Sequence, residues 1–86
     1  MSKYFGKHHL EGDIKAIPGI DMVTVDIPFI PDYIKVDFHG AHTDTDEIYW
    51  DLTKVDATSY QLSIAWSVYD EKHLCYRVAK LLTDPV

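Results

Sequence analysis

The side chains with the clearest capacity for chemistry lie in one polar stretch, residues 39–47, which reads His-Gly-Ala-His-Thr-Asp-Thr-Asp-Glu. Within it His42, Asp44 and Asp46 occupy alternate positions, and their imidazole and carboxylate groups are ligands that zinc and calcium use. The stretch lacks the ligand number and the central glycine of an EF-hand loop. Turn-forming polar residues also solvate exposed loops, so we interpret the stretch as a loop without a resident metal. A divalent-cation site, or direct contact of the loop with a partner or a sugar, is the alternative.

The sequence contains no convincing catalytic constellation. Serine, histidine and aspartate, cysteine and histidine, and paired glutamates do not occur in a context that favours nucleophilic or acid–base catalysis. The four glycines are scattered along the chain and cannot form a phosphate-binding loop. We therefore predict that the protein is not an enzyme, has no catalytic residue and uses no cofactor.

The single cysteine, Cys75, lies in the apolar run at residues 74–82. We interpret it as a small buried apolar residue. A catalytic thiol would need an electropositive neighbourhood, for which Arg77 on the same strand face is the only support. One cysteine cannot form a disulfide within the chain, which fits a reducing compartment or a phage-type particle.

Alternation of apolar and polar residues identifies the elements that must carry these groups. At residues 60–69, Leu62, Ile64, Trp66 and Val68 alternate with polar or small residues, which is the period of a β-strand with one buried face. The same period predicts further strands at residues 20–28, 33–38, 48–53 and 73–82. We expect the last of these to pair with residues 60–69 as an antiparallel hairpin across the polar turn at residues 70–72.

The segments between and before these strands have turn chemistry. Pro18 and Gly19 predict a type II turn, and the prolines at positions 28 and 31 predict a corner whose Phe29 and Ile30 plug one end of the core. Before them, residues 4–5 and 14–17 predict short edge strands, with a turn at Gly12 and Asp13.

Together these elements predict an all-β fold: a small antiparallel β-sandwich of six to seven strands, formed by residues 1–86 as a single domain. The predicted core consists of Val23, Val25, Ile27, Phe29, Ile34, Val36, Phe38, Ile48, Trp50, Leu52, Leu62, Ile64, Trp66, Val68, Leu74, Tyr76 and Val78. On the opposite strand faces, Tyr33, Tyr49 and Tyr69 point outward. Exposed tyrosines are either plain surface or contacts to a partner, so together with His39 they form the candidate partner or ligand surface.

The composition restricts the class of partner. Fourteen acidic residues against eight basic ones give a net charge of −6 at pH 7. Such a surface lacks the basic stripe that binds a nucleic-acid backbone. No apolar run has the length of a signal peptide or a transmembrane segment. We expect a soluble protein that binds neither nucleic acid nor membrane.

Two stretches carry a resemblance to a known family. In residues 23–38 a strand leads into Phe29-Ile30-Pro31 and a second strand, and residues 55–66 are followed by a strand that contains Tyr76-Arg77-Val78-Ala79. Across residues 20–82 this pattern resembles the H-type lectin-like sandwich of invertebrate agglutinins and of small bacteriophage tail-fibre and virion proteins. The resemblance implies a six-stranded sandwich that forms homotrimers and either binds carbohydrate or serves as a structural knob.

These observations favour a non-enzymatic phage virion structural protein that decorates a capsid or forms part of a tail fibre. Its partners would be copies of itself and other virion proteins, and its location the virion, with the host cytoplasm as the site of assembly. One alternative is a carbohydrate-binding lectin-like module. Another is a small acidic inhibitor that presents carboxylates to a host enzyme as a phosphate mimic.

Overall fold

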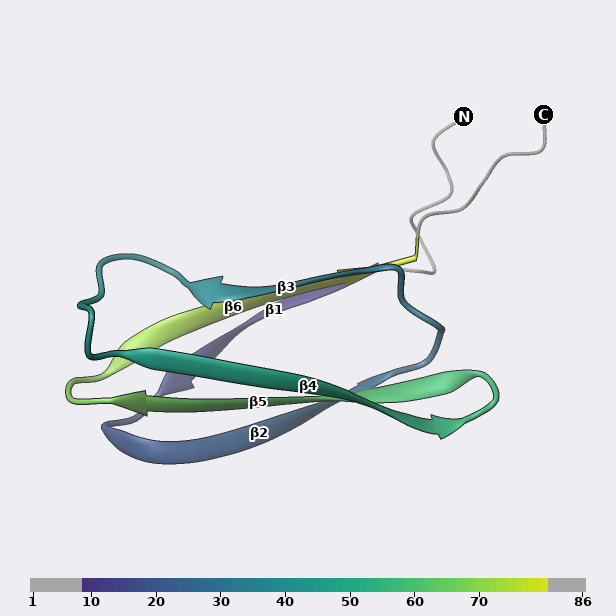
Figure 1. Cartoon of the computed structure of the whole chain (residues 1–86). Helices are drawn as coiled ribbons and strands as arrows, with labels where there is room; N and C mark the ends of the chain where they lie inside the picture. The colour runs from purple at the N-terminus through teal and green to yellow at the C-terminus, as the bar shows by residue number, and fades with distance from the viewer. Residues whose placement is uncertain (1–8, 81–86) are drawn as a thin grey trace, which may run out of the picture.

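The computed structural model describes residues 9–80, which form six antiparallel β-strands and no helix in that range (Figure 1). The predicted all-β class and sandwich architecture are therefore confirmed. The strands are β1 (His9–Ala16), β2 (Gly19–Ile27), β3 (Tyr33–Phe38), β4 (Glu47–Asp56), β5 (Ser59–Val68) and β6 (Lys72–Ala79).

The strands form two three-stranded sheets that face each other. Sheet A has the order β1-β6-β3, and sheet B has the order β2-β5-β4. Only the β4–β5 connection is a hairpin within one sheet, and the other connections carry the chain from one sheet to the other (Figure 1). The predicted corner at residues 28–32 is one of these crossings, where Phe29 is buried and Ile30 is 44% exposed. Only Phe29 therefore plugs the core.

The predicted hairpin between residues 60–69 and 73–82 is wrong. β6 pairs with β1 and β3, whereas β5 pairs with β2 and β4. The polar residues 70–72 thus join the two sheets. Alternation identifies which side chains of a strand face the core, but it carries no information on whether two strands share hydrogen bonds or face each other across that core.

The N-terminal strand also differs from the prediction. Gly12 and Asp13 do not form a turn; they lie in the middle of the eight-residue strand β1, opposite Tyr76 and Cys75. A Cβ atom on Gly12 would lie only 2.7 Å from the Tyr76 hydroxyl, so the missing side chain makes room for the tyrosine ring. The predicted strand at residues 4–5 lies outside the described residues.

The core lies between the sheets and follows the predicted faces closely. Ile27, Leu62, Ile64, Leu74 and Val78 are completely buried, and the remaining predicted members pack against them, with one exception. Trp50 is 46% exposed. It lies opposite Ile64, on the inward face, but β4 is an edge strand of a three-stranded sheet and cannot cover so large a ring from both sides.

Candidate functional site

The three predicted surface tyrosines are all exposed, but they do not form one surface. Tyr33 begins β3 in sheet A, Tyr49 lies on β4 in sheet B, and Tyr69 follows the end of β5. The Tyr49 hydroxyl donates a hydrogen bond to Glu47, which raises the pKa of that phenol. Tyr33 therefore lies apart in sheet A, whereas Tyr49 and Tyr69 belong to β4 of sheet B and to the end of its central strand β5.

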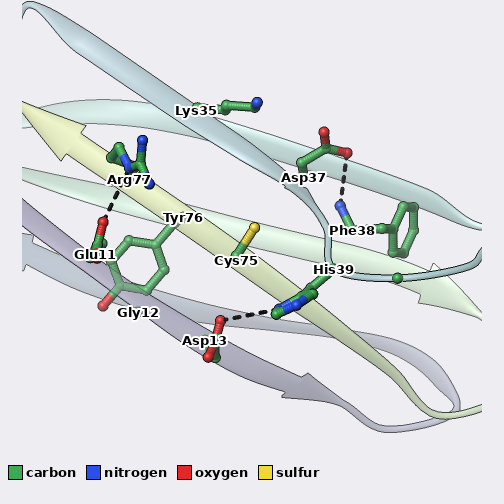
Figure 2. A pocket seen from close by; sticks show the side chains of 11 residues that line it. Glu11, Gly12, Asp13, Lys35, Asp37, Phe38, His39, Cys75, Tyr76 and Arg77 are labelled. Carbon is green, nitrogen blue, oxygen red and sulfur yellow. Dashed lines mark hydrogen bonds and ion pairs between the residues drawn. The ribbon is translucent and has the colours of Figure 1, made fainter.

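The outer face of sheet A is hollowed into an open depression of about 620 Å³, the sheet-A hollow (Figure 2). Two rungs of the sheet form its floor. In one rung Arg77 on the central strand lies between Lys35 and Glu11. Two residues back along the same strand, Cys75 lies between Asp13 and Asp37. His39 and Gly40, at the end of β3, close one side of the hollow.

The charges in this hollow are partly paired. The Arg77 guanidinium donates to Glu11 across 3.1 Å. His39 approaches Asp13 from the far edge of the sheet, with 3.8 Å between the ring nitrogen and the carboxylate. Within residues 9–80, Lys35 forms no ion pair. The hollow thus presents both basic hydrogen-bond donors and acidic hydrogen-bond acceptors on a shallow surface.

The cysteine does not occupy the position that we predicted. Cys75 is half-buried on the outer face of sheet A, with Asp13 and Asp37 on its two sides, and is not a core residue (Figure 2). The strand alternation places it there, because its neighbours Leu74 and Tyr76 point inward. A thiol between two carboxylates lacks the electropositive surroundings that activate a nucleophile.

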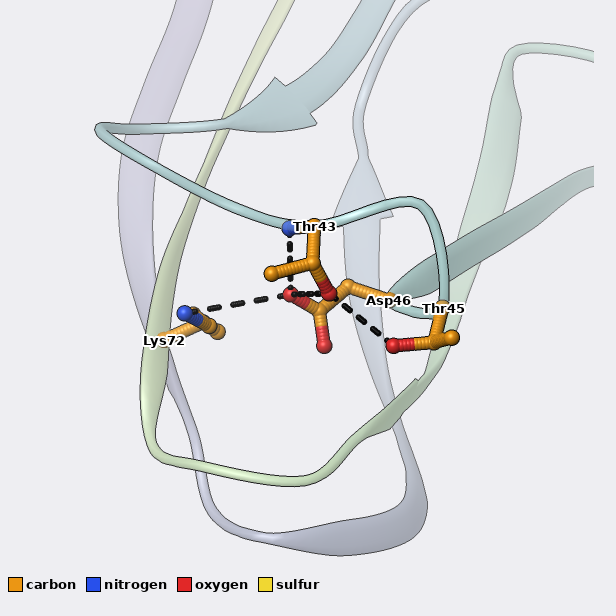
Figure 3. A network of polar contacts seen from close by, with 4 residues as sticks. All are labelled: Thr43, Thr45, Asp46 and Lys72. Carbon is orange, nitrogen blue, oxygen red and sulfur yellow. Dashed lines mark hydrogen bonds and ion pairs between the residues drawn. The ribbon is translucent and has the colours of Figure 1, made fainter.

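The loop of residues 39–47 is pinned by one carboxylate. Asp46 is buried and accepts hydrogen bonds from the Thr43 backbone N–H at 2.9 Å and from the Thr43 hydroxyl at 3.3 Å (Figure 3). The Lys72 ammonium lies 3.8 Å from the same carboxylate oxygen. The Thr43 N–H, followed by the Lys72 charge, holds the pKa of Asp46 below its usual value, although burial opposes this. The prediction that the whole loop is exposed therefore fails at Asp46.

This network separates the metal-ligand candidates. His42 stacks on Phe38, with 4.4 Å between the ring centroids, and Asp46 is engaged with Thr43 and Lys72. Across the part of the chain that the structure describes, no three His, Cys, Asp or Glu side chains are grouped so that they could hold a metal ion. Asp44 remains at the exposed tip of the loop.

A second, smaller depression of about 290 Å³, the end hollow, lies beside this loop. It is formed where three connections meet at one end of the sandwich: the β1–β2 turn, the β3–β4 loop and the β5–β6 turn, at the left in Figure 1. Ile20 and Tyr69 stand beside it and are 84% and 78% exposed. Thr45, from the loop that Asp46 pins, forms another wall.

The end hollow opens onto the outer face of sheet B. Along the central strand β5 this face carries small side chains at Ser63, Ala65 and Ser67. On the strands beside it, Met22 and Tyr49 lie opposite Ala65, and both are more than half exposed. The result is an apolar strip that continues from Ile20.

Charge is divided unequally between the two sheets. The strands of sheet A contain four basic residues and three acidic ones, whereas the strands of sheet B contain one basic residue and five acidic ones. In sheet B the acids are Asp21, Asp26, Glu47, Asp51 and Asp56, and the base is Lys54. Sequence reasoning missed this division, because it becomes visible only when strands are assigned to sheets.

Two edge strands carry a side chain that occupies an outward N–H group. β2 and β3 are edge strands, so alternate N–H groups point away from their single neighbour. Asp21 accepts the Met22 N–H at 2.8 Å, and Asp37 accepts the Phe38 N–H at 2.8 Å. On β4 the strand register shifts between Lys54 and Asp56. Such features are typical of edges that do not add another strand.

Among residues 9–80 there is no helix long and apolar enough to cross a membrane. No protein-family model, no curated protein and no solved structure matches this chain.

Proposed function

We propose that this chain is a non-enzymatic structural module that assembles with copies of itself, and that it does so as part of a virus-like particle. The self-association is supported chiefly by the apolar strip on sheet B. The setting in a particle, as capsid decoration or fibre component, is supported by the resemblance of residues 20–82 to small virion proteins.

The apolar strip is the single observation that carries the assembly function. Ile20, Met22 and Tyr49 expose most of their side chains along small residues of β5. Contiguous exposed apolar area on a small domain marks a surface that another protein covers. For a chain of this size, covering the strip also adds stability that its thin core lacks.

The mode of association follows from the edges and the charges. The carboxylates of Asp21 and Asp37 occupy an outward N–H group on each of two edge strands, which favours contact through a face over an added strand at β2 and β3. Two copies that met through identical sheet B faces would bring acidic side chains against acidic side chains. The contact is therefore heterologous, between different surfaces of two copies. Such a contact closes into a ring when the rotation between copies allows it, and the trimer that the resemblance implies would be such a ring.

Native mass tests this proposal directly. Sedimentation of the purified chain at micromolar concentrations should show a closed oligomer. Replacing Ile20 and Met22 by Glu should dissociate it, because charge would replace apolar area inside the contact. Val55→Glu is the matched control, since Val55 is also exposed but lies near the β4–β5 hairpin, away from the strip. A wild-type chain that stays monomeric at these concentrations refutes the proposal.

The sheet-A hollow supports one second candidate, a carbohydrate-binding module. Its shallow floor presents Asp13, Asp37, Arg77 and His39, which are groups that hydrogen-bond to sugar hydroxyls. Of the loop residues that could contact a sugar, Asp46 is engaged with Thr43 and His42 is stacked on Phe38, whereas His39 lines this hollow. A glycan array that gives signals removed by Arg77→Ala, but not by Lys54→Ala, would support this candidate, and an array without signals would exclude it.

A further inference from the structure

The end hollow has large apolar side chains beside its opening. Its two prominent walls, Ile20 and Tyr69, are among the most exposed large apolar residues that the structure describes. Asp46 holds the walls of the hollow together. Its carboxylate contacts Thr43 and Lys72 and also interacts with the backbone of Tyr69, which lowers the pKa of Asp46. It is therefore a preformed pocket with open apolar walls.

Three carboxylates flank the residues that line this hollow, and we call them its acidic rim. Asp44 precedes the wall residue Thr45, Glu47 lies opposite the floor residue Ser67, and Asp70 follows Tyr69. All three carboxylates are exposed, and none has an ion-pair partner within residues 9–80. A matching occupant must combine basic side chains with an aromatic or aliphatic one.

One segment of this same chain has that chemistry. Residues 1–8, which precede β1, read Met-Ser-Lys-Tyr-Phe-Gly-Lys-His. They contain Lys3 and Lys7 on either side of Tyr4 and Phe5, and no acidic residue. The other segment outside the described residues, 81–86, has one acidic residue and no basic one.

Distance decides whether this segment binds its own hollow or that of another copy. It joins the body at His9, and the eight residues of β1 then run roughly 26 Å, at about 3.3 Å per residue, to the end where the hollow lies. Eight residues reach at most about 29 Å when fully extended. After spanning the strand and crossing to the other sheet, the segment would have no residue left to fill its own hollow.

We infer that residues 1–8 of one copy bind the end hollow of a second copy, with Phe5 or Tyr4 between Ile20 and Tyr69 and the two lysines against the acidic rim. This inference rests on the proposed self-association and specifies its contact. The connection is heterologous and directional, in agreement with the charge division between the sheets.

Charge exchange tests the inference on the full chain. The arm variant, Lys3→Glu with Lys7→Glu, should raise the dissociation constant of the oligomer by roughly tenfold or more, and so should the rim variant, Glu47→Lys with Asp70→Lys. Combining all four substitutions in one chain restores opposite charges between copies. The dissociation constant of that combined chain should return to near the wild-type value.

Controls separate this contact from others. Lys35→Glu with Lys54→Glu changes the net charge by the same amount as the arm variant and should leave the native mass unchanged. Phe5→Ser should weaken association and Tyr69→Ser should do the same, with circular dichroism showing intact strands in each.

The outcomes are distinguishable from failure of the proposed function. A monomeric wild-type chain refutes both proposals. A wild-type oligomer whose mass the arm variant does not alter refutes the arm contact alone. An arm variant that loses thermal stability but keeps its mass would mean that the segment binds its own body, which also overturns the inference. The inference is also overturned if the chain with all four substitutions does not associate like the wild type.

Discussion

The carboxylate of Asp46 and the ammonium of Lys72 lie 3.8 Å apart and join the β3–β4 loop to the start of β6. Asp46 is buried and Lys72 half-buried, which is unusual for charged side chains in a domain this small. Through this pair, sheet A is tied to the loop that leads into sheet B. The same pair sets the position of the wall of the end hollow.

We expect Asp46→Asn to lower the thermal midpoint by several degrees, because the amide cannot match the carboxylate as acceptor from Thr43 or attract Lys72. Asp44→Asn is the matched control, since this neighbouring side chain is exposed, and its midpoint should equal that of the wild type. Thermal unfolding followed by circular dichroism measures both. Equal midpoints for the two variants would show that the pair does not hold the loop.

The pH dependence of stability should follow two aspartates. The N–H groups of Thr43 and Thr58 hold the pKa values of Asp46 and Asp56, respectively, below the ordinary value of 3.8. As the pH falls, these two carboxyls bind protons in the unfolded chain before they do so in the folded protein. Their contribution to the free energy of unfolding is therefore complete above pH 3.8, and it is lost as the pH drops through the lower pKa values of the folded protein. Midpoints measured between pH 2.5 and 7 should fall below pH 4, and less steeply in Asp46→Asn.

Gly12→Ala tests the packing of Tyr76. Alanine is ordinarily better than glycine in a strand by about 0.5–1 kcal/mol, but here its Cβ would lie 2.7 Å from the Tyr76 hydroxyl. We expect the clash to win and the free energy of unfolding to fall by about 1–3 kcal/mol. In a Tyr76→Leu background the same substitution should become neutral or stabilising, which chemical denaturation of all four proteins would reveal as non-additivity.

The two tryptophans should report different environments. Trp66 is 3% exposed and donates its indole N–H to the Ile17 carbonyl at 3.1 Å, whereas Trp50 is 46% exposed. Trp50→Phe should leave blue-shifted fluorescence that acrylamide quenches poorly, and Trp66→Phe should leave red-shifted fluorescence that it quenches well. If the oligomer covers Trp50, that second signal will become protected as the protein concentration rises.

Period-two alternation was sufficient to predict most of the core. In the strands at residues 33–38 and 60–69, each inward residue packs in or against the core. The rule works there because a β-strand turns successive side chains to opposite faces whatever its neighbours are. The side chain of Trp50 also points inward, as the rule predicts. It remains exposed because β4 is an edge strand and has a neighbouring strand on one side only.

Local composition was misleading at Gly12 and at Cys75. A glycine beside an aspartate is typical of a turn, and only the ring of Tyr76 on the neighbouring strand explains why that glycine lies inside β1. Cys75 follows the alternation of β6, but its apolar neighbours suggested burial. At Gly12 the deciding contact therefore comes from a residue 64 positions away, whereas at Cys75 the alternation itself was the better guide.

By itself, the sequence determined the β-class, the inward faces and the crossing at the two prolines, because each depends on local backbone geometry. Tertiary structure alone decided that β5 and β6 belong to different sheets, that Asp46 is buried against Lys72, and that acidic residues concentrate on sheet B. The reason is physical: side-chain direction repeats along a strand, whereas the choice of neighbouring strand depends on which apolar faces fit each other across the core.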